Sequence, residues 1–130
     1  MSLNDTIANA LAHVNNSEKS GKTQCIIRDV SKLTKEVLEI LKQNEFIEDF
    51  ALTKTNQGEF AQIALRGAIN RCGAIKPRFS LQLDEFEKFE KRFLPAKDFG
   101  IIIISTSKGL MTHIQAKEKK IGGKLIAYCY

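Results

Sequence analysis

Four consecutive isoleucines, residues 101–104, constrain the fold of this chain more than any other segment. The stretch from Phe99 through Ser105 is apolar on both faces if it is extended. A strand that is buried on both faces typically has a near-continuous aliphatic sequence, whereas in a half-buried strand apolar and polar residues alternate. We therefore expect residues 99–105 to form a strand at the centre of a β-sheet, followed by a turn at Ser107, Lys108 and Gly109.

The rest of the C-terminal half predicts further short elements. Asp84 and Glu87 have the spacing of a capping pair for a short helix that ends before Pro95. Thr112 and Gln115 have the same spacing and predict the start of a second short helix. We expect Gly122-Gly123 to end the second helix. The expected elements are a strand at 79–83, a helix up to 94, the central strand, a short helix after 112 and a closing strand at 124–130.

Residues before about position 68 predict a separate small lobe. Apolar spacing indicates a helix from Leu3 to Val14, with Asn4 or Asp5 as its cap and breaks at residues 15–17 and at Ser20-Gly21. The following expected elements are a strand at 23–28, a helix capped by Ser31 and a hairpin of strands at 46–53 and 60–66 around a turn at 56–58. The sequence thus predicts an α+β fold of two small lobes: residues 1–68, helix-strand-helix-hairpin, and residues 69–130, mainly β with short helices.

Charge is distributed unevenly between these two lobes. The chain has a net charge of +5, yet residues 1–70 carry eight Lys and Arg against nine Asp and Glu. Residues 71–130 carry twelve against six, a net charge of +6. A basic lobe beside a neutral one is typical of proteins that contact a polyanion, most often nucleic acid.

Several classes of function lack support in the sequence. There is no Gly-x-x-x-x-Gly-Lys, His-Glu-x-x-His or Gly-x-Ser-x-Gly motif, and the three cysteines match no zinc or redox spacing. No apolar run approaches the roughly 18 residues of a membrane-spanning helix. We therefore expect a cytoplasmic protein with no catalytic residues, metal, cofactor, small-molecule substrate or membrane contact. A thiol enzyme would require Cys72 or Cys129 beside a histidine in a pocket.

Hydroxyl groups and glycines at the expected strand ends are the candidate binding residues. Ser105, Thr106 and Ser107 emerge from a strand that the isoleucines should hold rigidly, and short hydroxyls can approach the shallow minor groove of RNA. Gly122 and Gly123 would let main chain approach the same surface. A polar turn and a flexible glycine turn remain alternative interpretations. Further candidate phosphate contacts are Lys108, Lys124, Lys76 and Arg78.

A protein-interaction module is the main alternative to an RNA-binding protein. In that case Phe86, Phe89 and Tyr130 would form an exposed apolar patch, and the positive charge would be incidental. The burial of these rings distinguishes the two interpretations, because core packing would remove the patch.

Several of these segments together resemble one family, the small-subunit ribosomal protein conventionally numbered eight. The resemblance rests on Gly100–Met111, which contains Ser-Thr-Ser-Lys-Gly, and on Ala116-Lys117 and Gly122–Tyr128. Asp5–Asn9 and Ser31–Leu33 are similar to the starts of that family's two N-terminal helices. The similarity extends over the whole chain. Lys124, where bacterial members commonly have Glu, and the Phe-rich segment 84–94 indicate the archaeal and eukaryotic type.

This resemblance implies a structural role in the small ribosomal subunit. Family members bind a stem in the central domain of small-subunit ribosomal RNA during early assembly, beside neighbouring ribosomal proteins. By similarity, the three hydroxyls at 105–107 would enter the minor-groove region, and the two glycines would lie close to the RNA. Ser31 and Lys32 are added as candidate contacts on the same grounds. Bacterial relatives also repress their own messenger RNA by mimicry of the ribosomal site, which is a second alternative function.

Overall fold

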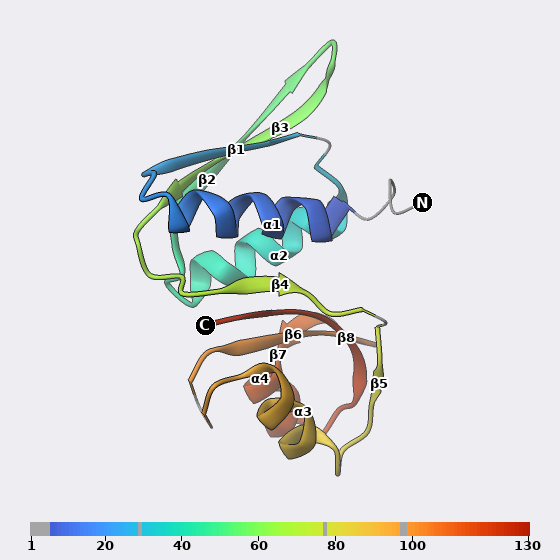
Figure 1. Cartoon of the computed structure of the whole chain (residues 1–130). Coiled ribbons are helices and arrows are strands. Elements are labelled where there is room, and N and C mark those ends of the chain that lie inside the picture. Colours follow the sequence, from blue (N-terminus) through green and yellow to red (C-terminus); the bar gives the residue numbers. More distant parts are fainter. Residues whose placement is uncertain (1–5, 29, 77, 97–98) are drawn as a thin grey trace. The chain divides into compact units, whose positions relative to one another are not determined.

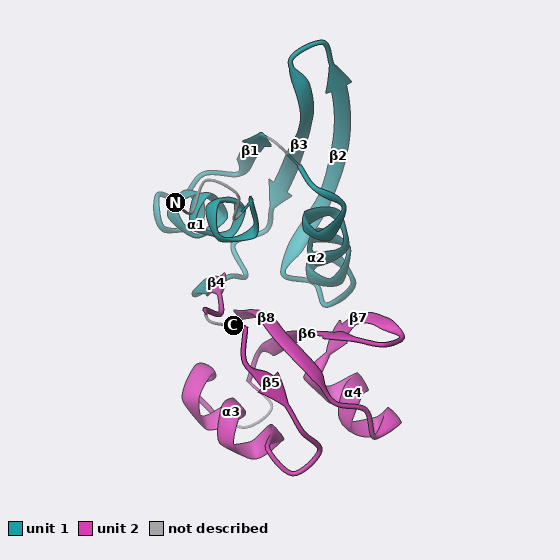
Figure 2. Cartoon of the chain, turned by 90° about the vertical axis from the view of Figure 1, so that its right-hand side faces the viewer, with its two compact units in different colours: residues 1–72 teal, residues 73–130 magenta. Residues whose placement is uncertain are grey.

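Residues up to Cys72 form the first of two compact units in the computed structural model, which describes residues 6–28, 30–76, 78–96 and 99–130 (Figures 1 and 2). Its three strands form an antiparallel sheet in the order β1-β3-β2. The elements are α1 (Thr6–Lys19), β1 (Gln24–Arg28), α2 (Lys32–Gln43), β2 (Ile47–Thr55) and β3 (Gly58–Leu65). This is the predicted order of helix, strand, helix and hairpin.

Alternating burial explains why one face of this sheet is covered by the helices. Cys25 and Ile27 on β1 are buried, whereas Ile26 between them is 57% exposed. The start of α2 is fixed locally, since the Thr34 amide donates to the Ser31 hydroxyl at 3.1 Å. The predicted cap is therefore confirmed.

Helix α1 continues through the predicted break at residues 15–17, so that prediction is wrong. Ser17 is buried within the helix, and packing there outweighs the modest intrinsic helix penalty of Asn and Ser. The helix ends at Lys19, at the second predicted break, Ser20-Gly21, where Gly21 has a φ of +74°, the left-handed conformation that glycine adopts easily. The predicted caps at Asn4 and Asp5 lie outside the described residues.

The second unit, Gly73–Tyr130, contains the isoleucine strand at the centre of its sheet. The strand order is β4-β8-β6-β7, with β5 also paired to β8. The elements are β4 (Cys72–Ala74), β5 (Ser80–Leu81), α3 (Phe86–Phe93), β6 (Ile101–Thr106), β7 (Gly109–Thr112), α4 (His113–Lys119) and β8 (Gly123–Cys129). All four isoleucines are buried, which confirms the predicted central strand. The units divide between residues 72 and 73, whereas the sequence placed the boundary between 68 and 69.

One face of β6 and its neighbours packs against the two short helices of this unit. Ile102 and Ile104 belong to a buried cluster with Leu125, Phe86 and Phe89, and the two phenylalanines are each 5% exposed. Tyr130 is half-buried and packs against the same cluster. Because Phe86 and Phe89 lie in the core, the three rings form no fully exposed apolar patch, and the alternative of an aromatic interaction module is weakened.

The structure corrects two local predictions before β6. The strand at 79–83 is reduced to two residues, because Leu83 is 56% exposed and no partner strand extends to it. Helix α3 has Glu85 as its N-cap without a side-chain capping bond, so Asp84 and Glu87 are not a capping pair. The Glu85 carboxylate instead accepts a hydrogen bond from the Gln82 amide at 3.0 Å.

The ends of α4 illustrate one confirmed and one wrong prediction. Its start is the predicted capping box, in which Thr112 and Gln115 bond each other's backbone amides. Its end is not at Gly122-Gly123, because Lys120 adopts the left-handed conformation with φ of 56° and caps the helix. The two glycines therefore require another explanation.

Candidate nucleic-acid interface

Three polar residues and one leucine, on four adjacent strands, form a row across the sheet of the second unit. Ser105 on β6 lies opposite Lys124 on β8 and Leu110 on β7, and Lys124 lies opposite Ser80 on β5. Residues directly opposite one another in antiparallel strands project from the same face. All four are at least partly exposed. We call Ser80, Lys124, Ser105 and Leu110 the polar row.

The polar row is rigid because the residues next to it on three strands are packed in the core. Ile104 lies opposite both Leu125 and Met111, and each of these three side chains is at most 5% exposed. Close-packed side chains of this kind hold the backbone in one arrangement. Ser105 and Lys124 therefore project from a fixed surface, which lowers the conformational entropy that a ligand must remove.

The tip of the β6–β7 hairpin lies beside the polar row. The Thr106 hydroxyl donates to the Gly109 carbonyl at 2.8 Å and accepts from the Lys108 amide at 3.1 Å. Ser107 and Lys108 are exposed at the tip. The hairpin thus uses the Thr106 hydroxyl to close its turn, while the Ser107 hydroxyl and the Lys108 ammonium face solvent.

Close backbone contacts account for both Gly122 and Gly123. A Cβ atom built on Gly122 would lie 2.3 Å from the Leu81 carbonyl oxygen, and one on Gly123 would lie 2.2 Å from the Ser105 carbonyl oxygen. Neither distance is sterically possible, and neither glycine has a positive φ. The pair therefore lets β8 start between β5 and β6 with no side chain in the way. This close approach places the glycine segment next to Ser105, as the binding hypothesis requires.

Sequence reasoning missed a buried polar cluster on α3 and α4. His113 is 1% exposed, and its Nδ1 accepts from the Ile102 amide at 3.1 Å. Its Nε2 lies 3.5 Å from the Glu90 carboxylate, and Glu90 is paired with the Lys117 ammonium. Lys117 is therefore occupied within the protein. Glu90 is one of several charged residues on α3, and no local pattern distinguishes it from its exposed neighbours Glu87 and Lys91.

The remaining candidate contacts are not members of the polar row. Lys76 and Arg78 are exposed in the segment before β5. Ser31 and Lys32 belong to the first unit, where the Ser31 hydroxyl lies 2.9 Å from the Thr34 hydroxyl as well as capping α2. Ser31 thus has a structural role, whereas Lys32 is exposed.

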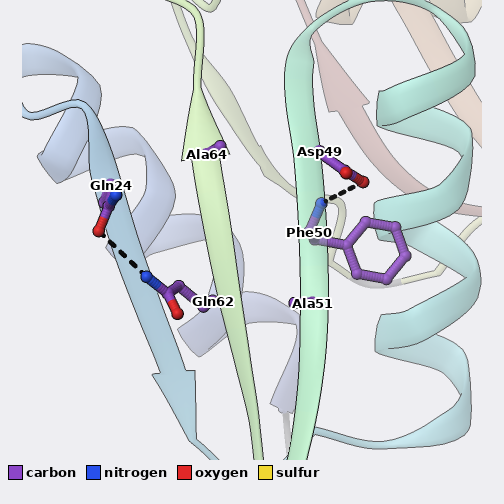
Figure 3. Close-up of a pocket in the computed structure, with 6 residues that line it drawn as sticks. All are labelled: Gln24, Asp49, Phe50, Ala51, Gln62 and Ala64. Carbon is purple, nitrogen blue, oxygen red and sulfur yellow. Dashed lines mark hydrogen bonds between the residues drawn. The ribbon is translucent and has the colours of Figure 1, made fainter.

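A shallow hollow of about 190 Å³ lies on the outer sheet face of the first unit (Figure 3). The Gln62 amide donates to the Gln24 side chain at 3.1 Å, and the Asp49 carboxylate accepts from the Phe50 amide at 2.8 Å. The Lys42 ammonium, 3.0 Å from Asp49, donates a hydrogen bond that holds the pKa of this carboxyl below its usual range. Because Asp49, the carboxylate among the residues that line the hollow, is paired with Lys42, these residues supply no group arranged for acid–base or nucleophilic catalysis.

The cysteines form no disulfide among the described residues. All three are reduced and buried, and burial raises the pKa of the Cys25 thiol. The Cys72 thiol donates to the Leu11 carbonyl at 3.4 Å. No group of three His, Cys, Asp or Glu side chains that could hold a metal ion occurs among the described residues. None of the helices described is long and apolar enough to cross a membrane.

The C-terminal segment that contains most of the polar row is rich in positive charge. Residues 99–130 carry five lysines and one acidic residue, Glu118. Exposed hydroxyls, closely packed main chain and lysines on a rigid sheet are typical of a small basic α+β protein that binds nucleic acid. The chain matches the family model described as Ribosomal protein S8 over residues 5–130, and it belongs to that family. It is a ribosomal, RNA-binding protein of translation, in a family of structural proteins and not of enzymes.

Proposed function

We propose that this chain binds a stem in the central domain of small-subunit ribosomal RNA and helps the subunit to assemble. The observation that carries the proposal is the polar row, which is fixed on a rigid sheet beside the hairpin tip. Hydroxyls suit the shallow minor groove of an RNA helix, where 2′-hydroxyls and base edges are exposed, because they both donate and accept hydrogen bonds. Ser105 and Ser107 supply such groups here.

Lysines near these hydroxyls can contact the phosphates of the two RNA strands that border the groove. Lys124 lies in the polar row itself, and Lys108 lies at the hairpin tip. Phosphate contacts set the orientation of a protein on a duplex, whereas groove contacts read its shape. The proposed arrangement is therefore a shape reader, with hydroxyls in the groove and ammonium groups on the backbone.

The Ser107→Ala variant tests the groove contact most cleanly. We expect about fivefold weaker binding to small-subunit ribosomal RNA, since one hydrogen bond contributes about 1 kcal/mol. Thermal stability should not change, because Ser107 is exposed and bonds no other described side chain or amide. The comparison is Thr106→Ala, which should lower both affinity and melting temperature because it opens the turn. Wild-type affinity in Ser107→Ala argues against hydroxyl recognition by the hairpin.

The Lys124→Ala variant tests the phosphate contact. The slope of log affinity against log salt concentration should become shallower by about one unit or slightly less, the value for one lost phosphate contact. Lys19→Ala is the matched control, because Lys19 is an exposed lysine at the end of α1 and lies in the other unit. Equal slopes for Lys124→Ala and wild type would remove Lys124 from the interface.

A further inference from the structure

Arg92 on helix α3 is held over two aromatic rings. Its guanidinium carbon lies 4.8 Å from the centre of the Phe79 ring and 5.3 Å from that of Phe93. Among the residues that the structure describes, no carboxylate is paired with Arg92, and its side chain is exposed. A guanidinium held by rings keeps its N–H groups available for a planar acceptor such as a phosphate.

The charges on α3 are sorted between its two flanks. Lys88 lies one turn before Arg92 on the same flank, with its ammonium 5.5 Å from the centre of the Phe89 ring. Like charges at this spacing repel each other in a free helix. Glu87 and Glu90 lie on the other flank, beside Lys117 of α4, where all three line one pocket. The flank of Lys88 and Arg92 therefore has positive charge that the helix itself leaves unbalanced.

Phe79 connects this basic flank to the polar row. The Phe79 carbonyl accepts a hydrogen bond from the Leu125 amide at 2.9 Å, and the next residue, Ser80, lies opposite Lys124. Arg78, directly before Phe79, is exposed. Figure 2 shows α3 near β5 and α4 near β7, at opposite ends of the same sheet face. Ser80 of the polar row and Phe79, over whose ring Arg92 lies, are thus neighbours in the chain, with the exposed Arg78 directly before them.

We propose that Arg92, with Lys88 beside it, is a second RNA contact that binds the sugar-phosphate backbone beyond the segment held by the polar row. Guanidinium groups pair with phosphate through two parallel hydrogen bonds. The two rings restrict the arginine before binding, so less side-chain entropy is lost on contact. This inference rests on the proposed function, because it requires the polar row to hold the same RNA.

The test compares Arg92→Ala with Lys91→Ala, since each variant removes one exposed cation from the last turn of α3. Binding is measured on a full-length small-subunit ribosomal RNA transcript over a range of salt concentrations. For Arg92→Ala we expect about tenfold weaker binding and a salt slope shallower by about one unit or slightly less. Lys91→Ala should bind within about twofold of wild type. Footprints should show one protected backbone segment that disappears in Arg92→Ala while the main protected stem remains.

The outcomes separate this contact from the proposed function. If the wild-type protein protects no stem, both proposals are overturned. If wild type binds and Arg92→Ala equals Lys91→Ala in affinity, slope and footprint, the second contact is overturned and the proposed function stands. Because Arg92 packs on two rings, thermal unfolding is recorded for each variant. Should Arg92→Ala be unfolded, Arg92→Lys replaces it, and an unchanged footprint in that folded variant overturns the planar phosphate contact.

Discussion

Replacement of Lys117 by methionine should lower the free energy of unfolding by about 3 kcal/mol, the lower end of the cost of breaking a buried ion pair. The Glu90 carboxylate is 4% exposed, and Lys117 is its charged partner. His113 cannot take over that role while its Nδ1 accepts the Ile102 amide, because the neutral ring then has a proton only on Nε2. The lower end is expected because Lys117 is 35% exposed, so water can approach the carboxylate.

A double-mutant cycle separates the ion pair from packing. Methionine keeps the length of the side chain that lies against Phe86, and Glu90→Gln removes the charge that needs a partner. The double variant should recover most of the lost stability, since it leaves no unpaired buried charge. Lys119→Met on the exposed side of α4 is the control and should match wild type in chemical denaturation. Equal stability of Lys117→Met and Lys119→Met contradicts a structural role for the pair.

The Gly123→Ala variant should lose both stability and RNA binding. A methyl group at this position meets the Ser105 carbonyl at 2.2 Å and the Ile104 side chain at 3.0 Å, so β8 must move away from β6. Overpacking of this kind costs about 1–3 kcal/mol, and backbone contact on a central strand places the expected loss at the upper end. The polar row should separate with the strands, which removes Lys124 from its position opposite Ser105.

Gly21→Ala provides the comparison for this effect. No atom lies within 4 Å of a Cβ at Gly21, so only its positive φ of +74° opposes a side chain. That strain costs about 1–2 kcal/mol. Gly21→Ala should therefore be mildly destabilised and bind RNA like wild type when folded. Wild-type RNA affinity in Gly123→Ala means that the strand spacing at this point is not part of the interface.

The elements that were predictable from the sequence have local causes. Ser31 and Thr112 start helices because their hydroxyls satisfy amides three residues away, and the isoleucine run needs burial on both faces. Such signals lie within a few residues of the element that they specify. The exposure of Ser107 and Lys124 was also predictable from neighbouring residues. Ser107 directly follows the apolar strand β6, and Lys124 lies at the start of the apolar strand β8.

The features that were missed depend on contacts between distant residues. Gly122 and Gly123 face the carbonyls of Leu81 and Ser105, and no local pattern distinguishes this from a helix cap. The pair of Glu90 and Lys117 joins two helices that are separated by the central strand. Strand β7 has only four residues and exists because it pairs with β6. Contacts between residues far apart in the sequence determine each of these features, and the local spacing of residues carries no information about such contacts.

Ribose footprinting of the wild-type protein on total small-subunit ribosomal RNA tests the central claim most directly. The account predicts one protected stem in the central domain, with protection of the riboses that border its minor groove. In the Ser105→Ala, Ser107→Ala double variant that ribose protection should weaken while contacts of Lys108 and Lys124 with the backbone remain. The absence of any protected stem, or a double-variant footprint identical to that of wild type at the same affinity, would contradict recognition by the hydroxyls of the sheet.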